Sequence, residues 1–411
     1  MIVNELSRKE LCVAAAGSAA AFRSITKLQP VGGEGDKVFP ATYSGGAYAT
    51  ERRSLEGTIV NCVLIDSVQS QANRAEEALK FAIERGRTRL PLIEVDFQNA
   101  NDNFRELLPN LTSLDVPHRL ADAILRDSVL PDGTRFSKSH YAQRWGRSNL
   151  CNATAVYELC PTALVFGMWG SPEKPGAMGA KFERAFVSEI VAVDVVSNLS
   201  ENTAARGPDA RKDIANKRFG FRIDPLKASK NVTIKQNTDG SFQAGVGKMR
   251  PSEINHGNIA FETSNCGIRF RYAEQTTVVS LGAIRKLRFP INGKDDPAVN
   301  DAGRAVLAAL GLCAGVLASE ANTSLRSRCH LWPLEEREWE LIERPGQPPR
   351  RFRMNGDQAV ALLNETAAAA SQLGLNWMEE KLILRPSPEL VQLIQMSQEA
   401  AVQEKGEGEA Q

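Results

Sequence analysis

The sequence predicts a mixed fold of strands and helices, of the α/β or α+β class, and two adjacent features carry this prediction. Residues Ile59 to Ile65 form a short apolar run, partly β-branched, that is typical of a buried strand. Directly after it, Asp66 or Ser67 can cap a helix whose apolar positions recur every three or four residues up to Ala82. A strand followed at once by an amphipathic helix opens a unit of either class.

Further stretches alternate between the two types along the chain, without a repeat of fixed period. Strands are predicted at Ala20 to Gln29, Ala163 to Trp169, Ala185 to Val196, twice within Ile259 to Ser280, and around Lys381 to Leu384. Helices are predicted at Arg119 to Val129, from Asp301 to near Ala321, and after Pro386, where Ser387 can cap and Pro388 can begin the helix. The helix from Asp301 has few charges, so we expect it to be almost wholly buried.

The composition is that of a soluble globular protein. Of 411 residues, 42% are hydrophobic and 24% are charged, which provides a sizeable core and excludes a disordered chain. The longest apolar run, Ala305 to Ala318, is shorter than the roughly 18 residues that cross a bilayer, so no membrane association is expected. Seven cysteines without a C-x-x-C pair suit reduced thiols, which predicts a cytoplasmic protein.

The charge is distributed unevenly along the chain. The formal net charge of +1 argues, taken alone, against a dedicated nucleic-acid binder. The stretch Arg206 to Arg288, however, holds 16 Lys and Arg against seven Asp and Glu, a net charge of +9. Leu334 to Gln411 holds eight against 14, a net charge of −6. The basic stretch is either an ordinary solvated surface or the footprint of a polyanion, and the acidic one can complement a neighbouring copy.

Common catalytic and metal-binding motifs are missing from the sequence. It has no Walker A loop and no G-x-S-x-G elbow, and its four histidines lie at no metal-ligand spacing. Asp66 occupies a position that a catalytic carboxylate could take, but helix capping is the favoured interpretation. We therefore expect no enzymatic activity, no cofactor and no metal site.

Several stretches together resemble one protein family. They are Phe39 to Tyr48 (FPATYSGGAY), Cys62 to Leu79 (CVLIDSVQSQANRAEEAL), Pro117 to Ser128 (PHRLADAILRDS), Asn152 to Trp169 (NATAVYELCPTALVFGMW), Gly179 to Asp194 (GAKFERAFVSEIVAVD) and Arg222 to Leu226 (RIDPL). The chain resembles the backbone subunit, number seven in the Cas nomenclature, of type I-G (formerly I-U) CRISPR Cascade, in the RAMP superfamily. The run with DSVQSQANR is the most specific of these segments.

The resemblance implies an α+β fold, with a modified RRM-like (ferredoxin-like) palm that carries inserted fingers and thumb regions. It implies one palm-based domain over residues 1–411, with fingers at 91–150, a thumb at 197–257 and a disordered tail at 405–411. The expected partners are the guide RNA (crRNA), the target DNA strand, further copies of the chain and other Cascade subunits. Copies would stack head to tail along the guide, gripping phosphates while base pairing reads the sequence.

Ten residues are candidate RNA contacts on these grounds. They are Gln69, Gln71, Asn73 and Arg74 at the start of the helix after Asp66, Arg23 and Lys27 on the first strand, His118 and Arg119, and Lys181 and Arg184 beside a glycine-rich loop. A helix N-terminus favours a phosphate through its free N–H groups and its dipole. Two alternatives stay open: a RAMP endoribonuclease that uses His118 or Asp36, and an interaction scaffold that does not bind RNA.

Overall fold

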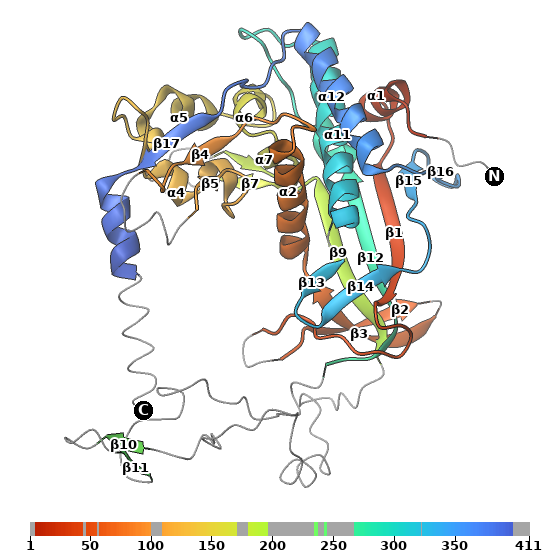
Figure 1. Ribbon diagram of the computed structural model, residues 1–411. Helices are drawn as coiled ribbons and strands as arrows, with labels where there is room; N and C mark the ends of the chain where they lie inside the picture. Colours follow the sequence, from red (N-terminus) through yellow and green to blue (C-terminus); the bar gives the residue numbers. More distant parts are fainter. Residues whose placement is uncertain are drawn as a thin grey trace.

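The computed structural model describes residues 5–43, 47–55, 57–99, 109–170, 180–195, 267–321 and 323–397, together with the backbone of 234–236 and 242–244. The tail at 405–411 and nearly all of the predicted thumb at 197–257 lie outside these residues. Within that thumb, β10 (Ile234–Gln236) pairs with β11 (Phe242–Ala244). The described elements form a mixed α and β structure around one large, curled antiparallel sheet (Figure 1).

The large sheet has nine strands, and its main path runs β13, β14, β1, β12, β9, β3, β2. The bounds of these strands, in the same order, are Ser324–Arg326, Cys329–Pro333, Ala21–Pro30, Phe270–Ser280, Phe186–Val195, Thr58–Asp66 and Thr50–Leu55. Off this path, β15 (Trp339–Ile342) pairs with β1 and with β16 (Arg350–Phe352). All neighbours along the path are antiparallel.

Connections between non-adjacent strands pass over one face of the sheet. The chain leaves β1, forms β2 and β3, continues through α2 (Val68–Glu84) and returns as β9, which runs parallel to β1 with β12 between them. From β12 it passes through α11 (Pro297–Ala321) to β14, which runs parallel to β12 with β1 between them. The two connections that contain helices α2 and α11 therefore cross the same face of the central strands.

Helices α2 and α11 cover that face together with α12 (Gly356–Gln372), α1 (Arg8–Ala16) and α10 (Leu281–Arg285) (Figure 1). Helix α11 begins at Pro297, four residues before the predicted Asp301, because proline is well suited to a first helical turn. It is the one described helix that is long and apolar enough to cross a membrane, and 78% of its most apolar window is buried in the protein. Within the protein it therefore packs as a buried core helix.

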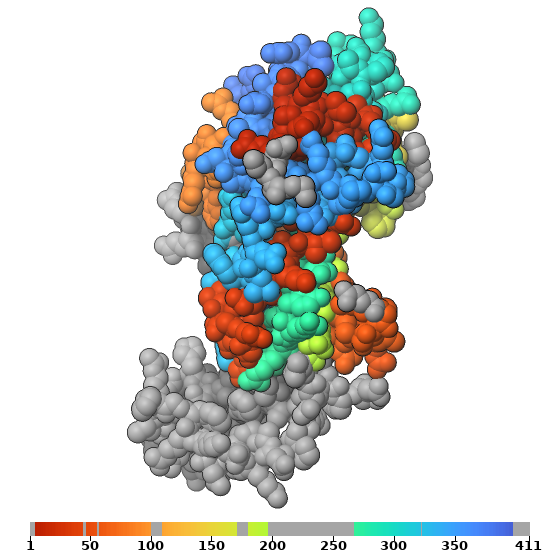
Figure 2. All heavy atoms as spheres, turned by 90° about the vertical axis from the view of Figure 1, so that its right-hand side faces the viewer, coloured from red at the N-terminus to blue at the C-terminus, as the bar shows by residue number. Residues whose placement is uncertain are grey.

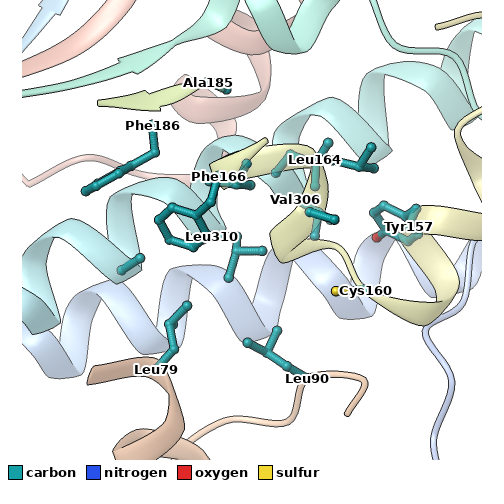
Figure 3. Packing of buried hydrophobic residues seen from close by; sticks show 14 of the residues in the cluster. Leu79, Leu90, Tyr157, Cys160, Leu164, Phe166, Ala185, Phe186, Val306 and Leu310 are labelled. Atoms are coloured by element: carbon teal, nitrogen blue, oxygen red, sulfur yellow. The ribbon is translucent and has the colours of Figure 1, made fainter. Parts of the chain in front are cut away.

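The main core forms where α11 meets the sheet and the neighbouring helices. Val306 and Leu310 of α11 contribute to the same buried cluster as Leu79 of α2, with Phe166 and Phe186 close by (Figure 3). The rings of Phe166 and Phe186 make an edge contact with centroids 5.2 Å apart. Gly311 and Gly315 allow this approach, since a Cβ atom at either would lie within 3.2 Å of Val279 or Phe186 on the sheet.

The opposite face of the sheet is more open. Along β1, buried residues alternate with Arg23, Ile25 and Lys27, of which Ile25 and Lys27 are exposed. In the space-filling view, β1, β12 and β9 reach the surface next to one another (Figure 2). The side chains on this face are therefore accessible to solvent. Next to the central strands, an ion pair at 2.9 Å joins Arg53 of β2 to Glu189 of β9.

A second, four-stranded sheet lies beside the helices, in the order β5, β4, β17, β6 (Figure 1). Its strands are Leu111–Thr112, Ile93–Val95, Leu382–Pro386 and Ser128–Val129. Around it lie η2 (Arg119–Ala121), α4 (Ala123–Arg126), η3 (Phe136–Lys138), α5 (His140–Trp145), α6 (Thr154–Leu159) and α7 (Thr162–Phe166). Because β17 pairs in parallel with β4, the C-terminal part of the chain completes the region predicted as fingers.

Two predicted elements differ from the structure, and a third region is described only in part. Residues 163–169 were predicted as a strand, but they form helix α7 and then β7 (Met168–Trp169), which pairs with β8 (Lys181–Phe182). A short apolar run does not distinguish a buried strand from a buried helix, and Pro161 favours a helix start. The helix predicted at Arg119 to Val129 is split, because Asp122 caps a new helix there. Of the region 259–280, only 267–280 is described, and it forms β12.

Several predicted elements are confirmed. The strands at Ala20 to Gln29, Ile59 to Ile65 and Ala185 to Val196 correspond to β1, β3 and β9, and that around Lys381 to β17. A last helix covers residues 388–397, and Ser387 Oγ accepts a hydrogen bond from the backbone N–H of Leu390 at 3.2 Å, as a capping residue does. The six described cysteines are free thiols.

Candidate nucleic-acid interface

The interface is organised around Asp66, the last residue of β3, whose side chain is fully buried. The helix cap at this point is Ser67, whose Oγ accepts a hydrogen bond from the Ser70 backbone N–H at 3.3 Å. The Asp66 carboxylate instead accepts hydrogen bonds from Ser70 Oγ at 2.9 Å and from Gln71 Nε2 at 2.6 Å. Of the two predicted caps, Ser67 is therefore correct, and Asp66 has a different role.

Two arginines hold the Asp66 carboxylate from different parts of the chain. Arg74, two turns into α2, approaches Oδ2 at 3.0 Å, and Arg326, at the end of β13, approaches Oδ1 at 2.7 Å. Arg74 also donates to the Leu325 carbonyl oxygen, and Arg326 donates to the Ile65 carbonyl oxygen at 2.7 Å. These bonds join α2, β3 and β13, and the cluster carries one carboxylate for two guanidinium groups.

The excess positive charge of this cluster is accessible to solvent. The side chains of Arg74 and Arg326 are 17% and 27% exposed. Next to them, at the turn between β13 and β14, Arg328 is exposed and lies over the ring of Phe39, with its guanidinium carbon 3.9 Å from the ring centroid. We name the exposed or partly exposed residues of this region the α2 surface: Gln69, Asn73, Arg74, Arg326 and Arg328.

Gln71 belongs to the interior and not to the α2 surface. Its Oε1 accepts hydrogen bonds from Ser188 Oγ at 3.0 Å and from Gln275 Nε2 at 2.8 Å, while its Nε2 donates to Asp66. Gln275 in turn accepts from Arg337 at 2.7 Å, and burial lowers the pKa of Arg337 to about 10. Every polar atom of the Gln71 amide group has a protein partner, so the structure places this predicted RNA contact in an interior hydrogen-bond network.

A second arginine pair lies further along α2. Arg119 is buried, with φ of +51°, and makes two hydrogen bonds to the Glu76 carboxylate at 2.6 and 2.7 Å. Burial raises the pKa of Glu76, and Arg119 opposes this shift. Arg119 also donates to the Gly167 carbonyl oxygen at 3.0 Å. Its guanidinium therefore joins α2 to the segment after α7, and the structure places this predicted RNA contact in the interior.

Arg184 lies beside this pair and has no carboxylate partner among the described residues. It donates to the Phe166 carbonyl oxygen at 3.1 Å, and burial together with the charge of Arg119 lowers its pKa. Lys181 is exposed on β8, with its ammonium 5.0 Å from the ring centroid of Trp169, whose side chain is itself exposed. The glycine-rich loop between β7 and β8 lies outside the described residues at 171–179.

The remaining predicted residues lie elsewhere. Arg23, on the open face of the sheet, pairs with Glu340 of β15 at 2.7 Å. Lys27 lies on the same face, with its ammonium 4.9 Å from the ring centroid of Tyr272. His118 is exposed at the start of η2, where its backbone N–H donates to Asp122 at 3.2 Å. The ten candidates thus lie on four parts of the chain: α2, the start of η2, β8 with residue 184 shortly after it, and β1.

Two arginines of the α2 surface had no signal in the sequence. Arg326 and Arg328 fall in the short segment SLRSRC, where nothing indicates contact with α2, and Arg326 is 260 positions from Asp66. The one feature of the sequence that points to this cluster is a carboxylate directly after a predicted strand, with an arginine two helical turns later. This pattern predicts that the carboxylate has a charge partner, but it does not say which residue is that partner.

Several glutamates of the acidic C-terminal stretch pair with arginine within the protein. Glu338 accepts a hydrogen bond from Arg353 at 2.9 Å, and Glu340 pairs with Arg23 and lies 3.5 Å from Arg351. Arg353 also pairs with Glu336. The pair with Arg23 joins β15 to β1. Arg351 and Arg353 belong to the stretch itself, so its net charge of −6 already includes them.

Comparison with known families gives one result for this chain. The model of the family described as CRISPR-associated protein GSU0053 matches residues 23–197. The chain is thus placed among the CRISPR-associated proteins. The matched segment runs from β1 to the end of β9 and contains Asp66, Arg74, Glu76 and Arg119. No curated protein gives a significant match.

In this CRISPR-associated protein, we expect Asp66→Asn to lower the free energy of unfolding by about 3 kcal/mol, because Arg74 and Arg326 then lose their buried counter-charge. Chemical denaturation at neutral pH measures this. The matched control is Asp357→Asn, whose carboxylate is 91% exposed and pairs with Arg87, and it should change stability little. Equal effects of the two substitutions would contradict the organising role of Asp66.

Proposed function

We propose that this CRISPR-associated protein is the guide-RNA-binding backbone subunit of a type I-G Cascade complex, with no catalytic step of its own. The observation that carries the proposal is the α2 surface, where two arginines share one buried carboxylate and a third lies exposed beside them. Guanidinium groups that are held in place, yet retain an excess positive charge, suit the phosphates of a strand whose bases stay free.

The arrangement of the strands supports a modified RRM-like, ferredoxin-like palm. In a βαββαβ unit of this type, the sheet order is the fourth, first, third and second strand, with antiparallel neighbours. The path β14, β1, β12, β9 has that order, and α2 and α11 lie in the two crossovers. On this interpretation the thumb interrupts the connection from β9 to β12, and the fingers interrupt the connection from α2 to β9.

The proposed subunit works in the cytoplasm with a guide RNA, a target DNA strand, further copies of itself and other Cascade subunits. Copies would stack head to tail, because a heterologous contact repeats without closing. Holding RNA through its phosphates is independent of sequence and leaves recognition to base pairing. The family match supports a role in CRISPR defence, and the α2 surface supports the contact with RNA.

We expect the purified protein to bind single-stranded RNA with an affinity that falls steeply with salt, because counterions are released from the phosphates. Arg328→Ala should reduce the slope of log K against log salt by about 0.7, the value for one lost phosphate contact on a single strand. Filter binding at several salt concentrations measures this. Arg344→Ala, at an exposed arginine in the turn after β15, should leave the slope unchanged. An affinity that does not depend on salt would overturn the phosphate contact.

Assembly on RNA tests the backbone role directly. Native mass spectrometry on RNAs of increasing length should give complexes that grow by whole copies of the 44.9 kDa chain, since each copy covers a fixed length of strand. An RNA too short for two copies serves as the control. One bound copy at every RNA length would contradict head-to-tail stacking and favour a simple RNA-binding protein.

The proposal also predicts that bound RNA stays intact in the presence of Mg²⁺. Asp36, the candidate for RNA cleavage in the loop after β1, is exposed, and its carboxylate accepts a hydrogen bond from the Lys37 backbone N–H at 2.8 Å. His118, the other candidate, is exposed in a different part of the chain. Denaturing electrophoresis after incubation measures cleavage. If the protein cut RNA and Asp36→Ala abolished the cutting, the endoribonuclease alternative would replace the proposal.

A further inference from the structure

A cavity of about 430 Å³ lies between α5, α6 and the turn before α11, and none of the ten predicted contacts lines it. Its lining residues come from three segments of the chain: His140, Gln143, Arg144 and Arg147; Asn152, Thr154, Ala155 and Glu158; and Pro290, Ile291 and Asn292. The volume falls in the range of pockets that bind small molecules. The α2 surface contributes no residue to it.

Hydrogen bonds hold the three segments together. The Arg288 backbone N–H donates to the Leu150 carbonyl oxygen at 2.8 Å, and the Ala153 backbone N–H donates to the Arg288 carbonyl oxygen at 2.9 Å. Thr154 Oγ1 donates to the Pro290 carbonyl oxygen at 2.9 Å. Because these bonds link the chain before α6 to the turn before α11, the walls of the cavity are already in place without a ligand.

The charge of the cavity is positive. Arg144 and Arg147 face one acidic residue, Glu158, and that carboxylate pairs with Arg144. Arg147 is exposed and its guanidinium makes no hydrogen bond or ion pair with the described residues. His140 adds an imidazole at the same rim. One guanidinium is therefore free to bind an anion, with the amide groups of Gln143, Asn152 and Asn292 nearby.

We propose that this cavity binds a nucleoside monophosphate group, with Arg147 as the phosphate ligand. The planar fork of a guanidinium matches two phosphate oxygens, and the amide side chains offer the donors and acceptors that a base or ribose requires. The group can be a free nucleotide or the phosphorylated end of a strand, because both present the same chemistry. This site is separate from the α2 surface and does not depend on the function proposed for it.

Isothermal titration of the full-length protein with adenosine 5′-monophosphate tests the proposal, with adenosine as the uncharged comparison. We expect the monophosphate to bind at least about tenfold more tightly than adenosine, and Arg147→Ala to lower its affinity by at least about tenfold. Arg385→Ala, at an exposed arginine of β17 that does not line the cavity, should have no effect. Thermal melting of both variants checks that they remain folded.

Three results would overturn the proposal: no binding of the monophosphate, equal binding of adenosine, or an unchanged affinity in folded Arg147→Ala.

Displacement of the bound monophosphate by RNA distinguishes the two sources of the group, a free nucleotide and a strand end. An oligonucleotide with a 5′-phosphate that displaces it better than the same strand with a 5′-hydroxyl identifies a strand end, and displacement by neither strand identifies a free nucleotide. Arg328→Ala should weaken RNA binding and leave monophosphate binding unchanged, so failure at one site is distinguishable from failure at the other.

Discussion

Helix α11 packs its apolar length against the sheet on one side and against α2 and α12 on the others, and the layers of the fold are defined by these contacts. Its glycines at positions 311 and 315 bring the helix close to β12 and β9, where a larger side chain would strike Val279 or Phe186. Interiors are packed as densely as crystals, so this approach also determines where α2 lies. The position of α2 in turn decides where its arginines reach the surface.

On the helix side of the sheet, each buried carboxylate of α2 and of the strand before it is paired with arginine. Asp66 binds Arg74 and Arg326, and Glu76 binds Arg119 with Arg184 beside it. A buried carboxylate without such partners would be costly. In both clusters the guanidinium groups outnumber the carboxylates, so internal pairing does not cancel the positive charge. These two clusters give α2 a cationic character that its own sequence, with its several glutamates, does not suggest.

The balanced net charge of the chain hides this arrangement. Most of the basic stretch from Arg206 to Arg288 lies outside the described residues, and in the acidic C-terminal stretch Glu340 pairs with Arg23 of β1 and Glu338 with Arg353. Cationic side chains offered by the described part therefore come from other places: the α2 surface, Lys181 and Arg184 near β8, and the cavity around Arg147. The net charge counted along a sequence does not predict the charge of the protein's surface, because ion pairs between distant parts of the chain decide which charges stay unpaired.

The sequence by itself determined the local elements: the strand before Asp66, a helix cap at Asp66 or Ser67, the amphipathic α2 and the buried α11 all follow from periodicity and capping. It also singled out Arg74 and Lys181 as candidate RNA contacts, and the structure shows that both side chains are at least partly exposed. Only the tertiary structure decided that Gln71 and Arg119 are interior and that Arg326 completes the cluster at Asp66. The physical reason is that capping and periodicity act over one or two turns, whereas burial and charge pairing join residues hundreds of positions apart.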